Sequence, residues 1–566
     1  MCIDCGATAQ PERSEGQGGL RSGPVLTRRA FLAGAAAGLA AACTRRSPFG
    51  QGETPPIRFP PPGPGGLTGT LPEEVMRRVW RGAMPERSGD IVYVPAGLNF
   101  LDGGISHSVP WPYMQRVPML WYGPGVIRAQ PPVSRPVTSA DVAPTLGLLT
   151  GHRFETPDAH PMDEILEPDA RRPRLIVVFV WDGAGRGVLK LWPDSWPNLA
   201  ALAAGGTSYR NATVGSSPST TAPVHATMGT GVFPRRHGVL DSYVRFDDGV
   251  VGDSWSRGPA GMLAPTFADD YGEATRHRAV IGIVATLSWH LGMMGRGRQA
   301  NGASTQLAAL RVGAKDTGLE GPQWGMADPV VDSYRFPAYL RDLPPLDAYL
   351  DRADASDGTV DGGWMGHPFD ELRLGFHSPA RIPYQQRGIE EVILREGFGQ
   401  DDIPDLLFLN SKLIDEVGHL FTASGIEMGE AIRAQDAALP RFLRYLDRTV
   451  GAGRWVMLLT ADHGHTAHPE LSGAFRIQVP ILQEIFAQAF PGGRRVAKRV
   501  RTSWTFINMN ELRRRGPDIA SVAALVGSLT KEQLVRDPST LSSTERSERA
   551  FAAAAPTSAL DALVAG

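Results

Sequence analysis

Acidic and imidazole side chains follow two apolar runs of the chain, where they could bind a divalent ion. Asp182 directly follows the apolar run at residues 175–181, and Asp462 with His463 follows the run at residues 455–460. Adjacent Asp and His at the end of a strand can converge on one ion, since carboxylate and imidazole are both zinc ligands. Taken alone, an aspartate in this position is more often a turn or helix-cap residue. These positions therefore need support from the rest of the chain.

A further carboxylate–imidazole pair and a threonine-rich loop provide that support. Asp415 and His419 are four residues apart, which on a helix places both side chains on one face, as a shared metal ion requires. The same spacing also suits a surface ion pair. Residues 219–231 begin as a loop of small residues and continue as a predicted helix, with Thr221 at the junction. A hydroxyl there faces a helix N-terminus, which favours phosphate, although an ordinary helix cap has the same pattern.

Apolar runs bounded by turn residues predict the strands that position these side chains. Helical stretches, such as residues 425–446, alternate with these strands. This pattern is typical of a parallel sheet covered by helices on both faces, in which chemistry gathers at the carboxyl ends of the strands. The predicted fold class is therefore α/β with a mostly parallel central sheet. The predicted strands cover residues 90–94, 117–122, 175–181, 279–285, 406–409 and 455–460, and a helix capped by Ser139 is predicted at residues 140–149.

The order of the motifs resembles the alkaline phosphatase superfamily, nearest to its type I phosphodiesterase/nucleotide pyrophosphatase branch. That family shows a strand-end Asp, then T-x-P-x-H leading to T-G-x-x-P-x-x-H-G, then D-x-x-G-H and D-H-G. In this chain the motifs are Asp182, Thr221 to His225, Thr230 to Gly238, Asp415 to His419 and Asp462 to Gly464. Four ordered motifs over nearly three hundred residues make a specific signal. The resemblance implies an alkaline phosphatase-like fold with an inserted cap region.

The resemblance also implies a role for each motif. Thr221 is the expected nucleophile, forming a phosphothreonine intermediate. Two divalent ions are expected, and the oxygen and nitrogen ligands suit zinc best, with manganese or another divalent ion as an alternative. One ion is expected on Asp182, Asp462, His463 and the Thr221 oxygen, and the other on Asp415, His419 and one more histidine.

The additional histidine has no counterpart in its usual place near the C-terminus, because the chain has no histidine after His468. Residues 88–126, with the helix around residues 141–146, resemble the closing block of the family and contain His107. We therefore infer that the catalytic domain is circularly permuted and that His107 is the missing ligand. His465 and His468 are the alternative candidates for this ligand. The inference predicts that the C-terminal region beyond about Leu512 returns near residues 72–90.

Two departures from the family bear on the substrate. The phosphodiesterase branch has an asparagine shortly after the threonine, where this chain has Val224. The monoesterases carry a lysine and an arginine that bind the phosphate, and the comparable stretch at residues 287–291 has His290 but no lysine. Since a monoester dianion needs such a cation, the sequence favours phosphodiesters or pyrophosphates. Val224 and His290 are therefore tentative substrate-binding positions, and His290 also suits a buried structural role.

The N-terminus resembles a twin-arginine export signal. Arg28 and Arg29 precede an apolar, alanine-rich run at residues 33–42 that is too short to span a membrane. Export through this route is expected, which makes the protein extracytoplasmic. Cys43 follows Ala40 to Ala42 in a pattern similar to a lipoprotein cleavage box, so lipid anchoring at Cys43 and plain secretion both remain open. Because residues 44–566 contain no cysteine, metal ligands there must be Asp or His.

The amino-acid composition limits the kinds of partner that the protein can bind. The 566 residues are 42% hydrophobic, and the formal net charge of −2 offers no basic footprint for nucleic acid. A small-molecule phosphate ester is the expected partner, and no protein partner is indicated. The expected segments are an export signal (1–43), a Pro/Gly-rich linker (44–71), a permuted closing segment (72–170), a catalytic core with the nucleophile (171–245), a core strand with a substrate-selecting insert (246–400), and the second half of the core with a C-terminal return (401–566).

Two other functions fit the same motifs. One is an alkaline phosphatase (monoesterase) or a sulfatase-like hydrolase on the same scaffold. The other is an inactive surface lipoprotein that uses the fold only for binding, although suitable side chains at all seven expected positions argue against it.

Overall fold

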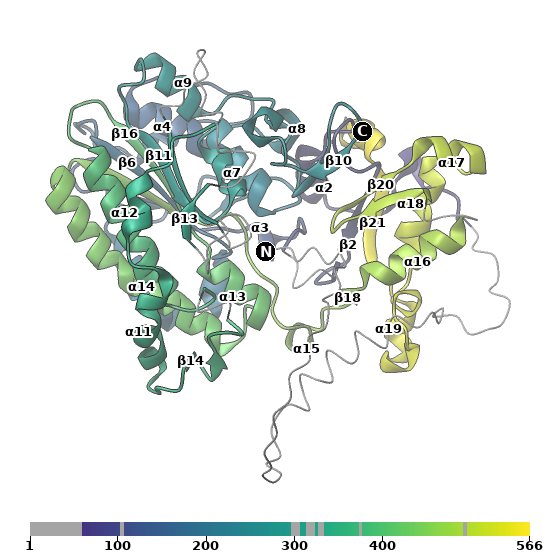
Figure 1. Cartoon of the computed structure of the whole chain (residues 1–566). Helices are drawn as coiled ribbons and strands as arrows, with labels where there is room; N and C mark the ends of the chain where they lie inside the picture. The colour runs from purple at the N-terminus through teal and green to yellow at the C-terminus, as the bar shows by residue number, and fades with distance from the viewer. Residues whose placement is uncertain are drawn as a thin grey trace, which may run out of the picture.

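A computed structural model describes residues 59–101, 107–295, 306–312, 323–326, 333–372, 376–490 and 495–565. The predicted export signal, Cys43 and most of the linker lie outside these residues. Figure 1 shows a larger unit with a central sheet and a smaller unit that combines segments from the early and the late part of the described chain. In the part of the chain that is described, no helix has both the length and the apolar character needed to cross a membrane.

The larger unit is built on an eight-stranded sheet. Five central strands run parallel. At the edges, β13 and β4 run antiparallel to them, and β7 pairs antiparallel with β4. The predicted α/β class is confirmed, and the predicted strand at residues 117–122 is one of the antiparallel members. The order is β13 (Gln323–Gly325), β12 (Leu307–Val312), β11 (Ile281–Ala285), β16 (Asp405–Ser411), β6 (Leu175–Trp181), β17 (Trp455–Thr460), β4 (Met119–Tyr122) and β7 (Thr207–Ser208).

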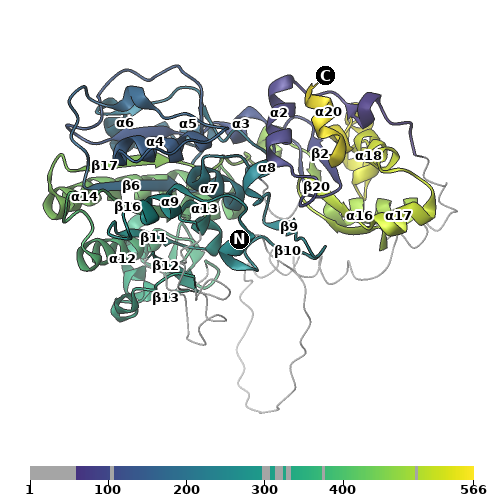
Figure 2. The same ribbon diagram turned by 90° about the horizontal axis from the view of Figure 1, so that it is seen from above.

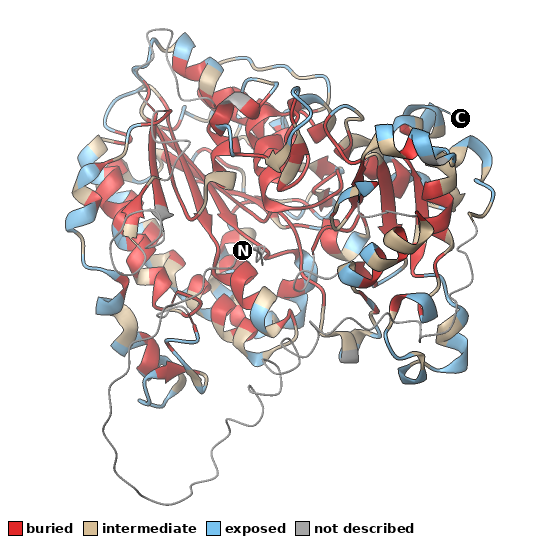
Figure 3. Cartoon of the chain, turned by 45° about the vertical axis from the view of Figure 1, so that its right-hand side comes forward, coloured by how far each residue is buried: buried red, intermediate tan, exposed pale blue. Residues whose placement is uncertain are grey.

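Helices cover both faces of this sheet. In Figures 1 and 2, α12 (Arg381–Glu396) and α14 (Ile426–Leu446) lie on one face, and α4 (Val142–Thr150), α7 (Thr221–Thr230) and α9 (Phe267–Ala274) lie on the other. Every residue of β6, β16 and β17 is therefore buried, as Figure 3 shows. Strands buried on both faces need continuous apolar runs, which explains why the sequence predicted them.

The helix predicted at residues 140–149 is present as α4, but its cap differs from the prediction. Ser139 is buried within a short 3-10 turn, Ser139–Asp141, that leads into α4. Thr138 precedes this turn, and its backbone N–H donates to Asp141 Oδ2 at 2.6 Å. The cap therefore lies one residue earlier, because the extra turn begins before the α-helix.

The smaller unit contains a five-stranded antiparallel sheet made from both ends of the described chain. Its order is β1 (Thr68–Gly69), β21 (Phe551–Pro556), β2 (Ile91–Pro95), β20 (Trp504–Ile507) and β19 (Ala497–Val500). The C-terminal helix α20 (Leu560–Ala565) contacts α2 (Glu73–Gly82), where Trp80 Nε1 donates to Asp561 at 2.7 Å. The predicted return of the C-terminal region is confirmed. The circular permutation itself stays a hypothesis.

Candidate active site

Three adjacent parallel strands bring the predicted acidic residues together. Asp182 directly follows β6, Asp462 lies two residues after β17, and Asp415 lies on α13 (Leu413–Phe421), which begins just after β16. Because β16, β6 and β17 are neighbours and end at the same edge of the sheet, the carboxylates converge there. All three aspartates are fully buried. Buried carboxylates at this density require cations close by.

Asp182, Asp462 and His463, here called the Asp182 group, can hold one divalent ion. Ligand atoms of all three lie within 4.8 Å of one another. His463 Nδ1 lies 3.0 Å from Gly464 O and must donate to it, so the Nε2 lone pair is free to bind a metal. His463 Nε2 and Asp462 Oδ2 are buried and have no hydrogen-bond partner in the structure. Such atoms fit a site for a divalent cation.

Asp415, His419 and His107, here called the Asp415 group, are the residues predicted for a second ion. Ligand atoms of His107 and Asp415 lie within 4.8 Å of one another and of a His463 ligand atom, and His419 faces the same carboxylate. Asp415 Oδ1 lies 3.6 Å from His107 Nε2 and 3.5 Å from His419 Nε2. His107 Nδ1 faces Ser219 O at 3.4 Å, which leaves its Nε2 directed at Asp415. The His107 ring stacks on His463, with 3.6 Å between the centroids. The structure thus brings His107 to Asp415 and His419 from far along the chain, as the sequence predicted.

The rival histidines lie in different surroundings. His465 Nε2 is 2.9 Å from Asp415 Oδ1, closer than His107, and His465 is buried. His468 is partly exposed, and its backbone N–H donates to Ser424 Oγ at 3.2 Å. Since His465 can donate a proton to Asp415, it can orient this carboxylate without itself binding the metal. His107 therefore stays our predicted ligand, with His465 as a positioning residue.

Thr221 is the first residue of α7, where unpaired backbone N–H groups and the helix dipole favour an anion. The side chain is buried among polar partners rather than exposed as a surface cap. The carbonyl oxygen of Thr221 accepts a hydrogen bond from His225 Nδ1 at 2.8 Å, which fixes the first turn of the helix. His225 Nε2 in turn lies 3.1 Å from Asn410 Nδ2. The Thr221 hydroxyl is thus held at a junction suited to a phosphoryl group.

Lys412 is a site residue that belongs to none of the predicted motifs. Its ammonium lies 2.8 Å from Asp182 Oδ1, 2.7 Å from Asp415 Oδ2 and 2.9 Å from Thr221 Oγ1. The side chain is 2% exposed. The chain has only five lysines, and this one lies three residues after the apolar run at 406–409 and three residues before Asp415, which is the signal that could have identified it.

The charges of this centre are only partly balanced. Burial would raise the pKa of Asp182 and of Asp415, but Lys412 and the neighbouring histidines together outweigh burial and hold both pKa values well below the usual range. Burial and the neighbouring Asp182 raise the pKa of Asp462 well above its usual range. Burial outweighs the nearby carboxylates at His419 and lowers its pKa to about 3, which leaves the imidazole neutral as a metal ligand must be. One ammonium is not enough for three carboxylates, so further cations are favoured here.

The two tentative substrate-binding residues are His290, which contacts Asp182, and Val224, which lies in the main hydrophobic core. His290 is fully buried, and its Nε2 lies 3.4 Å from Asp182 Oδ2, while its Nδ1 accepts a hydrogen bond from Leu287 N at 3.1 Å. This geometry orients Asp182. Val224 is fully buried in the main hydrophobic core and its side chain offers no polar atom to a substrate. With Asp182, His225 and His290 form another group of close ligand atoms.

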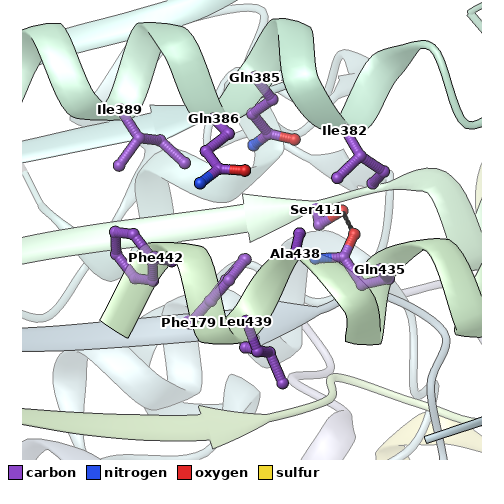
Figure 4. A pocket seen from close by; sticks show the side chains of 10 residues that line it. All are labelled: Phe179, Ile382, Gln385, Gln386, Ile389, Ser411, Gln435, Ala438, Leu439 and Phe442. Atoms are coloured by element: carbon purple, nitrogen blue, oxygen red, sulfur yellow. Dashed lines mark hydrogen bonds between the residues drawn. The ribbon is translucent and has the colours of Figure 1, made fainter. Parts of the chain in front are cut away.

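The end of β16 is held in place by glutamines from two helices. Gln385 Nε2 of α12 donates to Asn410 O at 2.6 Å, and Ser411 Oγ donates to Gln435 of α14 at 2.5 Å. Figure 4 shows these side chains around a cavity of about 30 Å³, a volume that has room for a water molecule but is too small for a substrate. The bonds fix the two residues that precede Lys412. The cavity is thus a support for the site rather than a binding pocket.

Comparisons with known proteins agree with this geometry. A model of the type I phosphodiesterase / nucleotide pyrophosphatase family matches residues 176–535. This span includes every residue of the Asp182 group and of the Asp415 group except His107. Alkaline phosphatase PhoV of Synechococcus elongatus is 26% identical over 55% of this chain, and alkaline phosphatase PafA of Elizabethkingia meningoseptica is 24% identical over 52%. The matches span 62% and 60% of the lengths of these relatives.

A crystal structure of alkaline phosphatase PafA has the same fold. It superposes with a TM-score of 0.50 and 18% sequence identity, covering 64% of this chain and 77% of that one. The family match extends over well more than half of the 566 residues. The chain therefore belongs to the type I phosphodiesterase / nucleotide pyrophosphatase family, within the alkaline phosphatase superfamily.

Proposed function

We propose that this protein is a metal-dependent phosphoric ester hydrolase that acts through a phosphothreonine intermediate on Thr221. The observation that carries the proposal is the position of Thr221 Oγ1 at the N-terminus of α7, within 2.9 Å of an ammonium that also contacts Asp182 and Asp415. Family membership supports ester hydrolysis, and two relatives are named alkaline phosphatases.

The Asp182 group and the Asp415 group would each hold one divalent ion. Their carboxylate and imidazole ligands suit zinc best. Two such ions supply positive charge for in-line displacement at phosphorus and favour the ionised forms of the attacking and leaving oxygens. We assign the Asp182 group to the attacking oxygen, because the resemblance to the family implies that the ion on these residues also binds the Thr221 oxygen. The Asp415 group then belongs to the leaving oxygen.

The proposed reaction has two steps. Thr221 Oγ1 forms a bond to phosphorus, the bond from phosphorus to the ester oxygen breaks, and the alcohol leaves with the proton lost by Thr221. Water then attacks the phosphothreonine, which releases phosphate and restores the hydroxyl. The N-terminal N–H groups of α7 stabilise the oxygens of the phosphoryl group in both steps.

Trapping the intermediate tests this function. We expect zinc-loaded protein incubated with 4-nitrophenyl phosphate, then quenched in acid and digested, to yield a peptide in which Thr221 carries one phosphoryl group. Thr220→Ala is a matched control that removes the neighbouring hydroxyl, which bonds to Asp241 instead, and it should still be labelled at Thr221. Turnover without a labelled Thr221 would exclude the intermediate. An absence of turnover in fully metal-loaded protein would favour the inactive binding protein.

We also propose that the twin-arginine signal exports the protein, after which it is secreted or anchored through Cys43. Replacing Arg28 and Arg29 by lysine should leave the precursor in the cytoplasm, as cell fractionation would show. Export of this double variant at the normal level would contradict the proposed route.

A further inference from the structure

Lys412 stands where it can contact a phosphoryl group on the nucleophile. Its ammonium lies 2.9 Å from Thr221 Oγ1, the atom to which phosphorus would be attached. The nonbridging oxygens of that group extend from phosphorus by one bond, into the space around Oγ1. A cation at hydrogen-bond distance from Oγ1 can therefore donate to one of these oxygens, with the added strength of a charge-assisted bond.

The ammonium uses one carboxylate oxygen from each of the two metal groups. It contacts Asp182 Oδ1 and Asp415 Oδ2, whereas His107, His419 and His465 face Asp415 Oδ1. Asp462 Oδ2 and His463 Nε2 have no hydrogen-bond partner. Lys412 therefore adds a cation that shares one carboxylate oxygen with each ligand group, while Asp415 Oδ1, Asp462 Oδ2 and His463 Nε2 make no contact with it that competes with a metal ion.

The charge balance decides which ester such a centre fits. Three carboxylates and two divalent ions leave one positive charge, which the monoanion of a phosphodiester balances. The Lys412 ammonium adds a second positive charge, which the dianion of a phosphate monoester balances. Another buried cation nearby, Arg381, does not change this balance, because its guanidinium is paired with Glu416 at 2.7 Å.

We propose that Lys412 is a specificity-determining residue that binds a nonbridging oxygen of the substrate and makes this protein a phosphate monoesterase. The inference rests on the proposed hydrolase function and names its substrate class. It revises the sequence expectation of diesters, which followed from the missing lysine at residues 287–291. The structure supplies a cation from the end of β16 instead.

Matched aryl substrates test this role. We compare zinc-loaded wild type, Lys412→Met and Lys190→Met on 4-nitrophenyl phosphate and methyl 4-nitrophenyl phosphate. Lys190 is exposed on α5 (Arg186–Leu191), so its variant is the control for loss of a lysine. We expect Lys412→Met to lower kcat/KM for the monoester by about 10²–10³-fold. The diester should change less than about tenfold, so the ratio of the two rates moves by at least one order of magnitude.

Two further measurements keep the test decisive. Inorganic phosphate should bind to Lys412→Met more weakly than to wild type by calorimetry, and zinc content should be the same in both. Equal loss on both substrates would overturn the proposal. So would wild type that holds one zinc per chain while Lys412→Met holds two, because the ammonium would then occupy a metal position. If wild type hydrolyses neither ester, the hydrolase function fails, while phosphate binding still tests Lys412.

Discussion

Thr221→Ala is expected to lower kcat/KM for phosphate esters by roughly 10⁴-fold or more, since the variant lacks the atom that accepts the phosphoryl group. The Asp182 and Asp415 groups remain intact, so zinc binding should persist. Any residual rate would come from water attacking a substrate held by the remaining groups. Steady-state kinetics on zinc-loaded protein, with zinc content measured on the same samples, would give the change.

Thr221→Ser separates chemistry from structure, because it keeps the hydroxyl and removes only a methyl group. We expect it to retain far more activity than Thr221→Ala and to be labelled in the trapping experiment. Thr221 is buried at the start of a helix packed in the core, so a thermal unfolding curve should accompany each variant. A Thr221→Ala protein that is folded, metal-loaded and as active as wild type would remove the proposed nucleophile.

The central strands were predictable because their burial demands a local pattern. Strands β6 and β17 begin and end as the apolar runs do. The antiparallel direction of β4 was not predictable, because an apolar run predicts a strand but not the direction of that strand relative to the neighbouring strand in the sheet. The separate sheet of the smaller unit was not predicted for a similar reason. Its strands come from the early and the late part of the described chain, and β2 contacts β21 across more than 450 residues.

The candidate site shows the same division between local and distant signals. Asp182, Asp415, His419, Asp462 and His463 stand in short motifs that can be recognised one at a time. Lys412 belongs to no such motif, and its partners Thr221 and Asp182 are 191 and 230 residues away in the chain. The roles of His225 and Asn410 behind Asp182 were also missed, because they depend on contacts between α7 and β16.

His107→Ala is expected to lower the zinc content from two ions per chain to one, and kcat/KM by about 10³-fold, since one of the two cations is lost. His465→Ala should keep both ions when zinc is in excess and lose about 10–100-fold in activity, as expected for a residue that orients a ligand. The physical basis is the direction of the rings. His107 Nε2 points at Asp415 Oδ1 while its Nδ1 faces Ser219 O, whereas His465 is already within hydrogen-bond distance of that carboxylate.

Zinc content after dialysis, measured by mass spectrometry, distinguishes these roles without any activity assay. His152→Ala is the matched control, because His152 is partly exposed and pairs with Asp270 away from the site. It should retain both ions. If His107→Ala kept two ions while His465→Ala or His468→Ala lost one, the usual order of ligands after D-H-G would hold. The hypothesis of a permuted chain would then lose the ligand that motivated it, even though β2 and β21 still share a sheet.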